Sequence, residues 1–363
     1  MRAYLQLIGH RDARWPLLTS MVSRLTPGMM ILALVLLLRE HGYSYAAAGL
    51  VSAGHQLGVG LASPLQGRMV DRHGQVRVLV PDAVLYLGGT VGLATTAAAG
   101  TPVPLLVVTA LATGAFYPPV TAASRVLLSR LFPSGQLRET AFAVSSISVE
   151  LGFVVGPLLA VAVAEAATAS WSVMLAGAAA AVGAVGYSTT PAARDMPPRQ
   201  GRRPSGGALH AEGVRVIVLA IGLAAIAFGV LDITVPAVAE FAGDRTVAGR
   251  LIATLATGSL LSGVVYGGRM WPGTLPERLR FFAGGLAVAM LVLPLTVADL
   301  RVFSVGLFVA GVFLAPTTIC AFQLLDDLAI RGTETEGQSW VHQTMLNVTD
   351  SKIIDLFLED ECL

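Results

Sequence analysis

Three charged residues lie inside long apolar runs of the sequence: Arg24, Glu150 and Asp232. An ionisable group at bilayer depth costs about 2.5 kcal/mol or more, so it normally faces a partner or a water-filled cavity. Arg24 and Glu150 are at similar depths from the same side of their runs, so we expect them to pair. Such a pair is either a protonation switch or a static ion pair. Asp232 is either a cavity residue or a residue at the outer water boundary.

A second group of polar residues lies in the stretch GRMVDRHGQVR at positions 67–77. Glycines allow two helices to approach each other closely, and fixed charges form contacts that can be made and broken. We expect this loop to be a conformational switch. Its candidate residues are Gly67, Asp71, Arg72, Gly74 and Arg77.

A third motif is GFVVGP at positions 152–157. Small residues spaced four apart let membrane helices pack closely, and a proline bends a helix. Gly152, Gly156 and Pro157 are therefore candidates for a functional helix contact, although helix packing alone would explain the same spacing.

The composition indicates that lipid surrounds the elements that carry these residues. The chain of 363 residues is 54% hydrophobic and 13% charged, whereas a soluble domain has about 25% charged residues. Ten segments are apolar over the roughly 20 residues that a membrane-spanning helix needs. They run from Trp15 to Leu38, Tyr45 to Pro64, Val76 to Ala99, Val103 to Leu128, Thr140 to Ala162, Ala169 to Tyr187, Val214 to Phe241, Thr246 to Tyr266, Leu279 to Ala298 and Val302 to Leu325.

The positions of the arginines predict the orientation of these segments. Alternate loops and the span ends beside them carry arginine clusters, which include Arg125 and Arg138, whereas the opposite loops hold only Arg39, Arg245, Arg250 and Arg301. Basic residues near the ends of spans are retained on the cytoplasmic side. We therefore expect a multi-pass protein of the plasma membrane with both termini in the cytoplasm.

The sequence divides into two halves. Residues 190–213 are rich in Pro, Gly and Arg and have the composition of a flexible linker. The triplet GRM at 67–69 recurs at 268–270, about 200 residues later, which indicates that the halves share one ancestral unit. We expect a six-span half at 1–189, the linker at 190–213, a four-span half at 214–326 and a polar cytoplasmic tail at 327–363.

The loop at 67–77 resembles the major facilitator signature G-x-x-x-D-R-x-G-R-R between spans two and three. Gly67, Asp71, Arg72 and Gly74 fit it, whereas the two final basic residues are replaced. The stretch 152–157 resembles the G-x-x-x-G-P signature in span five of exporters of this family. The family's arginine in span four is absent, since Ala110 occupies that position.

The resemblance implies an all-α membrane protein, a helical bundle of two related halves with about ten transmembrane helices. Spans one, four, seven and ten of the family line a central cavity, which here implies lining by Arg24, Phe116, Tyr117, Asp232, Phe313 and Thr317. The implied function is secondary active transport by alternating access, with export of a small amphipathic solute and with protons as one option for the coupling ion.

Several other classes of function are not supported. Basic residues form no cluster of the kind that binds nucleic acid, and Cys320 and Cys362 make neither a disulfide framework nor a metal site. No H-E-x-x-H, G-x-S-x-G or phosphate-loop pattern occurs. We expect no enzyme activity, cofactor or metal, and we expect the partners to be the bilayer, the solute and protons.

The C-terminal region indicates an alternative to the transport function. Residues 332–340 resemble the start of an eleventh span, but the sequence after Val341 is polar and acidic. We therefore expect the helix that faces Asp71 in this family to be missing and transport to be weak or absent. In that case the chain would be a truncated, non-transporting membrane protein.

The predicted orientation can be tested at His73, in the loop of the switch motif. A cysteine at this position, in a chain without Cys320 and Cys362, should react in intact cells only with a membrane-permeant thiol reagent. Reaction with an impermeant reagent would place this loop outside the cell and invert the topology.

Overall fold

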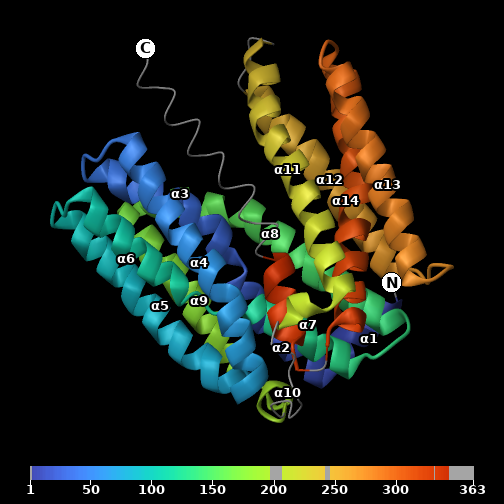
Figure 1. Cartoon of the computed structure of the whole chain (residues 1–363). Helices are drawn as coiled ribbons and strands as arrows, with labels where there is room; N and C mark the ends of the chain where they lie inside the picture. The colour runs from blue at the N-terminus through green and yellow to red at the C-terminus, as the bar shows by residue number, and fades with distance from the viewer. Residues whose placement is uncertain (1, 197–206, 242–245, 331, 343–363) are drawn as a thin grey trace.

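The protein is a bundle of helices (Figure 1). The computed structural model describes residues 2–196, 207–241, 246–330 and 332–342, and within these ranges there is no strand. This confirms the predicted all-α class.

Residues 2–196 form a first group of helices. The helices of this group are α1 (Arg2–Gly9), α2 (Arg11–Ser23), α3 (Leu25–Glu40), α4 (Tyr45–His73), α5 (Gln75–Ala98), α6 (Val103–Ala115), α7 (Val120–Leu131), α8 (Gln136–Ala166), α9 (Ala169–Thr189) and α10 (Pro191–Arg194). Short turns join them. Gly74 ends α4 with a φ of 91°, a backbone conformation that strongly favours glycine.

Two of the predicted spans are broken in the middle. The first changes from α2 to α3 at Arg24, and the fourth changes from α6 to α7 at residues 116–119. The second break follows from Pro118 and Pro119, because proline has no N–H to donate and also disfavours helical geometry in the residue before it. The phenolic hydroxyl of Tyr117 donates to the Ser23 carbonyl at 3.3 Å, which joins the two breaks.

The second group follows residue 207. It comprises η1 (Ala208–His210), α11 (Glu212–Phe241), α12 (Thr246–Gly268), α13 (Leu275–Val292), η2 (Leu293–Thr296), α14 (Leu300–Leu328) and a short helix at 334–342. The carboxylate of Asp299 caps α14 by accepting from the Arg301 amide at 2.8 Å, as expected for a residue that satisfies free N–H groups at a helix start.

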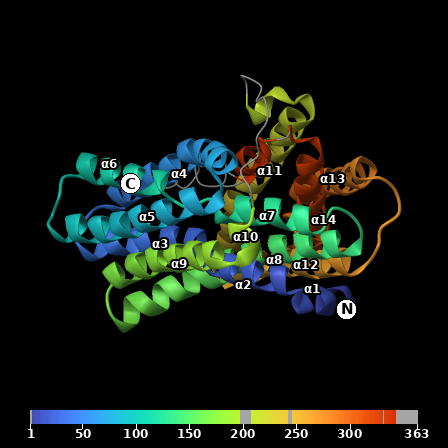
Figure 2. The same ribbon diagram turned by 90° about the horizontal axis from the view of Figure 1, so that it is seen from below.

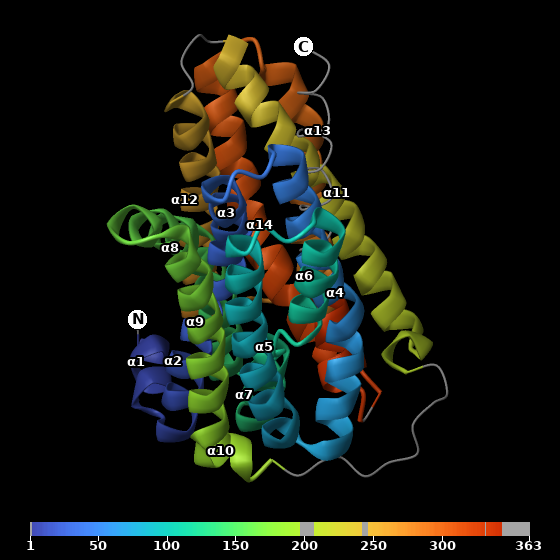
Figure 3. The same ribbon diagram turned by 90° about the vertical axis from the view of Figure 1, so that its left-hand side faces the viewer.

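The two groups lie side by side and meet along α8, which packs against α12 and α14 (Figures 1 and 2). The helices of the two groups diverge toward the upper end of Figure 1 and converge at the lower end, where α10 lies. We call the lower end the α10 end. Figure 3 shows the face of the first group, with α4, α5, α6 and α9 in front.

Reciprocal glycine contacts hold equivalent helix pairs together in the two groups. In the pair α4 and α6, a Cβ atom at Gly58 would overlap the Leu111 carbonyl, and one at Gly114 would overlap the His55 carbonyl. In the pair α12 and α14, Gly258 and Gly311 make the same kind of contact with the opposite backbone. Small residues of this kind allow membrane helices to approach backbone to backbone.

Eight helical stretches within the described residues are long and apolar enough to cross a membrane. They agree with the prediction of a multi-pass membrane protein. The segments predicted at 45–64 and 214–241 are also helical, within α4 and α11, but are not among the eight. The count of ten spans therefore stays a prediction.

Candidate functional site

Asp71, in the last turn of α4, contacts the start of the 334–342 helix. Its Oδ1 accepts a hydrogen bond from the Thr335 amide and its Oδ2 one from the Glu336 amide, both at 3.1 Å. The first N–H groups of a helix have no partner within the helix, and their partial positive charge favours an anion. Asp71 is therefore an N-terminal cap supplied by a helix of the other group.

Two further contacts fix the same helix start. Glu336, which is buried, forms an ion pair with Arg68 at 2.8 Å and accepts from the Ala208 amide at 3.1 Å. A Cβ atom on Gly67 would lie 2.8 Å from the Glu336 Cα atom, so a larger residue at this position would displace the helix. We call these contacts of Asp71, Arg68 and Gly67 with residues 335–336 the latch.

The expectation that Asp71 faces no helix is wrong for the described residues. Residues 334–342 are helical, and most of their side chains are buried. The sequence suggested a missing helix because the apolar run after residue 332 is too short for a span, but a helix cap needs only the first turn. Of the other switch residues, Gly74 ends α4, whereas Arg72 and Arg77 are exposed.

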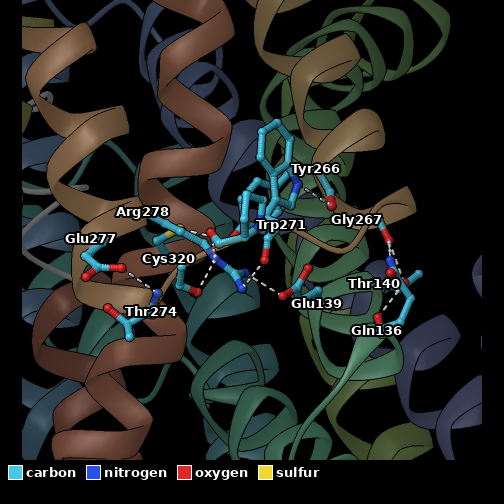
Figure 4. Close-up of polar contacts among 12 residues, drawn as sticks. Gln136, Glu139, Thr140, Tyr266, Gly267, Trp271, Thr274, Glu277, Arg278 and Cys320 are labelled. Carbon is cyan, nitrogen blue, oxygen red and sulfur yellow. Dashed lines mark hydrogen bonds and ion pairs between the residues drawn. The ribbon is translucent and has the colours of Figure 1, made fainter.

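A second cluster joins α8 to α12 and α13 at the same end (Figure 4). The Glu139 carboxylate forms an ion pair with Arg278 at 2.6 Å, and both side chains are largely buried. Arg278 also donates to the Trp271 carbonyl at 2.6 Å. The hydroxyl of Thr140 donates to the Gly267 carbonyl at 2.6 Å, so α8 is bound to the last turn of α12.

A third cluster joins α7 and α8 to the end of α14. Arg138 contacts Asp327 at 2.6 Å and Asp326 at 3.4 Å, and the hydroxyl of Ser129 donates to Asp326 at 3.1 Å. Sequence reasoning used Arg138 only as a topological charge and did not single out the two aspartates. Their placement at predicted span ends on one side was the available signal.

Helix α1 makes a fourth contact between the groups. The hydroxyl of Tyr4 donates to the Val264 carbonyl on α12 at 2.9 Å. Burial raises the pKa of the Tyr4 phenol, so this hydroxyl stays protonated and remains a donor.

Arg24 is buried at the break between α2 and α3 and donates to serines of α7 and α8. Its guanidinium contacts the hydroxyl of Ser124 at 2.8 Å, that of Ser145 at 3.1 Å, and that of Ser148. It also donates to the Ser145 carbonyl at 3.1 Å. These contacts hold the first, fourth and fifth predicted spans together.

The predicted pairing of Arg24 with Glu150 is wrong in this structure. Glu150 accepts instead from the hydroxyl of Ser259 on α12 at 2.8 Å. Residues two positions apart on a helix point to opposite sides, so Ser148 faces Arg24 while Glu150 faces the other group. The depth inferred from the sequence was not sufficient, because the direction around the helix axis also decides which side chains meet.

The glycines of the 152–157 motif pack α8 against the start of α3. A Cβ atom on Gly152 would overlap the Arg24 carbonyl, and one on Gly156 would lie 2.8 Å from the amide nitrogen of Met29. Pro157 lies inside α8. The contact is therefore within the first group of helices, and a role of this motif in export stays a prediction.

The aromatic and polar cavity candidates do not gather in one place. Phe116 is 39% exposed, whereas Tyr117 is buried. Phe313 lies edge-on to Phe281 with 6.4 Å between ring centroids. Thr317 lines an apolar groove of about 660 Å³ between α11, α13 and α14.

The remaining candidate, Asp232, lies in α11, and its side chain is outside the described part of the structure. Sequence reasoning missed Asp82, a buried carboxylate on α5 that accepts from Gln66 at 3.1 Å.

The whole arrangement matches a known family. Residues 17–345 match the family model of the Major Facilitator Superfamily. The chain belongs to this superfamily. It is a membrane transporter and not an enzyme, as the sequence predicted, whereas the drug-efflux type and the truncation stay predictions.

Solved transporters share the fold of this superfamily member at low sequence identity. A bacterial homologue of the iron transporter ferroportin, in an outward-facing state, has a TM-score of 0.76 and 16% identity, over 98% of this chain and 93% of that chain. The human organic anion transporter TETRAN has a TM-score of 0.73 and 17% identity, over 96% of this chain and 94% of that one.

A proton:xylose symporter bound to 6-bromo-6-deoxy-D-glucose has a TM-score of 0.67 and 16% identity, over 95% of this chain and 88% of that chain. No curated protein sequence matches the transporter at a significant level. At these identities the structural likeness shows the fold alone.

The latch can be tested by replacing Asp71. In Asp71→Ala the amides of Thr335 and Glu336 lose acceptors worth about 1.5–3 kcal/mol each, so the latch should open more often. A cysteine at Ser339, which is 1% exposed, should then react with a soluble thiol reagent about tenfold faster or more, in a chain without the native cysteines. Asp71→Asn keeps one acceptor oxygen, so its reaction rate should lie between those of the Asp71 and Asp71→Ala chains. Equal rates in all three chains would contradict the latch.

The separation of Arg24 from Glu150 can be tested by a double-mutant cycle. Because the two side chains have different partners, the losses of unfolding free energy in Arg24→Met and Glu150→Gln should add to within about 0.5 kcal/mol. Denaturant unfolding of the purified chain in neutral detergent gives these values. A coupling well above this limit would show that the two charges interact after all.

Proposed function

We propose that this chain is an alternating-access transporter that exports a small amphipathic solute, with protons as the coupling ion. The observation that carries the proposal is the set of polar contacts between the two helical groups at the α10 end. The latch, the Glu139 pair and the Arg138 cluster all connect α4, α7 or α8 to the second group.

These contacts have the properties of a gate. Ion pairs and hydrogen bonds near an aqueous surface are replaced by bonds to water when they open, so their net contribution is modest, about 0.5–3 kcal/mol each. A few such contacts favour the closed state without making it permanent. A continuous apolar interface at the same place would expose hydrophobic surface on every cycle.

The direction of opening follows from the proposed topology. If the arginine-rich loops are cytoplasmic, the α10 end is the cytoplasmic end, and the structure is closed toward the cytoplasm. The similar bacterial homologue was solved in an outward-facing state, which supports this interpretation. Export is proposed from the motif of Gly152, Gly156 and Pro157.

Glu150 is the proposed proton carrier. It lies between the two groups, where its carboxylate accepts from Ser259, and a carboxylate in a low-dielectric site exchanges a proton when its solvation changes. Movement of α12 away from α8 breaks this bond and changes that solvation. Proton binding at Glu150 is thereby connected to the movement of the two groups.

The alternative is a membrane protein that inserts but does not transport. One physical argument for it was the missing helix at Asp71, and the 334–342 helix removes that argument. The remaining argument is that, within the described residues, the second group has fewer long helices than the first.

The two functions can be separated in sealed liposomes that contain the purified transporter and an imposed pH gradient. We expect gradient-driven movement of at least one of a panel of fluorescent amphipathic solutes, and loss of this movement on adding a protonophore. Glu150→Gln should lose the response to the pH gradient but keep solute exchange at equal concentrations. The matched control is Glu165→Gln, which replaces an exposed carboxylate near the C-terminal end of α8.

Absence of flux for the whole panel, in vesicles where an unrelated proton-driven transporter is active, would favour the non-transporting alternative. Flux that responds equally to the pH gradient in the Glu150→Gln and control chains would contradict the role of Glu150.

A further inference from the structure

Two arginines are buried next to each other in the middle of the bundle. Arg24 is 2% exposed and Arg125 is 1% exposed. They are neighbours in space, because Arg24 donates to the hydroxyl of Ser124, the residue before Arg125. Sequence reasoning treated Arg125 as a topological charge near the end of its span, and only the structure shows that it is inside.

The guanidinium of Arg125 lacks the hydrogen bonds that such a group requires. Its Nε and Nη1 atoms, and the Nε atom of Arg24, have no partner among the described residues. The plane of Arg125 lies over the ring of Phe322, with 3.4 Å from Cζ to the ring centroid. This contact stabilises the positive charge to some extent. It does not supply acceptors for the N–H groups on Nε and Nη1 of Arg125.

Among the described residues, no carboxylate is paired with either of these two arginines. Three acids of the first group have other partners. Glu139 pairs with Arg278, the half-buried Glu150 accepts from Ser259, and the buried Asp82 accepts from Gln66.

Two buried arginines without a counter-charge are energetically unfavourable unless a bound anion neutralises them. A buried charge without a partner costs several kcal/mol, and neighbouring like charges add to this cost. Guanidinium groups are well suited to carboxylates and other oxyanions, which they bind through two parallel N–H donors. The Nε and Nη1 atoms of Arg125 have no partner among the described residues, so their N–H groups are donors that an oxyanion could use.

We propose that Arg24 and Arg125 form the anion-binding part of the solute site, so that the transported solute is a small amphipathic organic anion. The two guanidinium groups bind its oxyanion, and the rings of Phe322 and Tyr117 contact its apolar part. This proposal rests on the proposed transport function and names its substrate class.

The location of the site fits a transporter. Arg125 belongs to the first group of helices and Phe322 to the second, so the contact between them crosses the interface that the gate closes. The site is closed in this conformer and becomes accessible when the two groups separate. A bound oxyanion then contributes to holding the groups together, because it neutralises the repulsion between the arginines.

The matched probes for a test are 2-naphthoate and 2-naphthamide, which have the same ring system and differ in charge. Equilibrium dialysis of the purified full-length chain in neutral detergent measures binding, and the neutral amide reports partition into the micelle. The variant is Arg125→Met. Its control is Arg39→Met, which removes an exposed arginine that also lies over an aromatic ring, that of Tyr45 at 4.1 Å.

We expect saturable binding of naphthoate and not of naphthamide, unchanged in Arg39→Met and weakened about tenfold or more in Arg125→Met. Without ligand, Arg125→Met should unfold at the same temperature as the unmodified chain or at a higher one, because an unpaired buried charge has been removed. Naphthoate should raise the unfolding temperature of the unmodified chain but not that of Arg125→Met.

Other outcomes would overturn the proposal. A lower unfolding temperature of Arg125→Met with unchanged naphthoate binding would make Arg125 a structural support. If this variant does not fold, Arg125→Lys, which keeps the charge but loses the paired donors, must still show weakened binding. A response to phosphatidylglycerol but not to naphthoate would assign the site to a lipid headgroup.

This experiment is independent of transport. Binding of naphthoate by a chain that moves no solute would support the anion site and contradict the proposed function. Transport of neutral or cationic solutes by a chain that does not bind naphthoate would support the proposed transport function and contradict the anion site.

Discussion

The first backbone N–H groups of the 334–342 helix need acceptors, and the carboxylate of Asp71 supplies them from the opposite group of helices. The position of this helix determines much of the interface. It brings Glu336 to Arg68, and it lets the side chain of Gln338 donate to the Phe322 carbonyl at 3.1 Å. Phe322 in turn lies under Arg125. The cap at the α10 end is thus connected, through the 334–342 helix, to the buried arginines.

The two groups of helices also share a packing rule that their sequences hardly show. Gly58 and Gly114 bring α4 and α6 into backbone contact, and Gly258 and Gly311 do the same for α12 and α14. The close contact in each pair leaves the remaining faces of these helices available for other partners. The repeated triplet at 67–69 and 268–270 agrees with the predicted duplication, although only its first copy joins the latch.

The sequence predicted the features that depend on one segment at a time. Apolar runs predicted helices, and the spacing of Gly67, Asp71 and Gly74 singled out residues that the structure places in the last turns and at the end of α4. Their role as a switch stays a prediction. Features that depend on two distant segments were missed or wrong. Hydrophobicity placed Arg24 and Glu150 at similar depths but could not say which way each side chain points. The pairs of Glu139 with Arg278 and of Arg138 with Asp327 need the relative positions of helices that only the fold provides.

The bond between Tyr117 and Ser23 has a mechanical meaning. It joins the points at which two spans are interrupted. In the fourth span Pro118 and Pro119 cannot donate backbone hydrogen bonds, which makes a helix less stiff. Below these points lie α2 and α7, which pack against each other, and above them lie α3 and α6. The first half of the transporter is therefore a jointed body with compliance at the level of Arg24, and motion at its base need not be transmitted in full to its upper part.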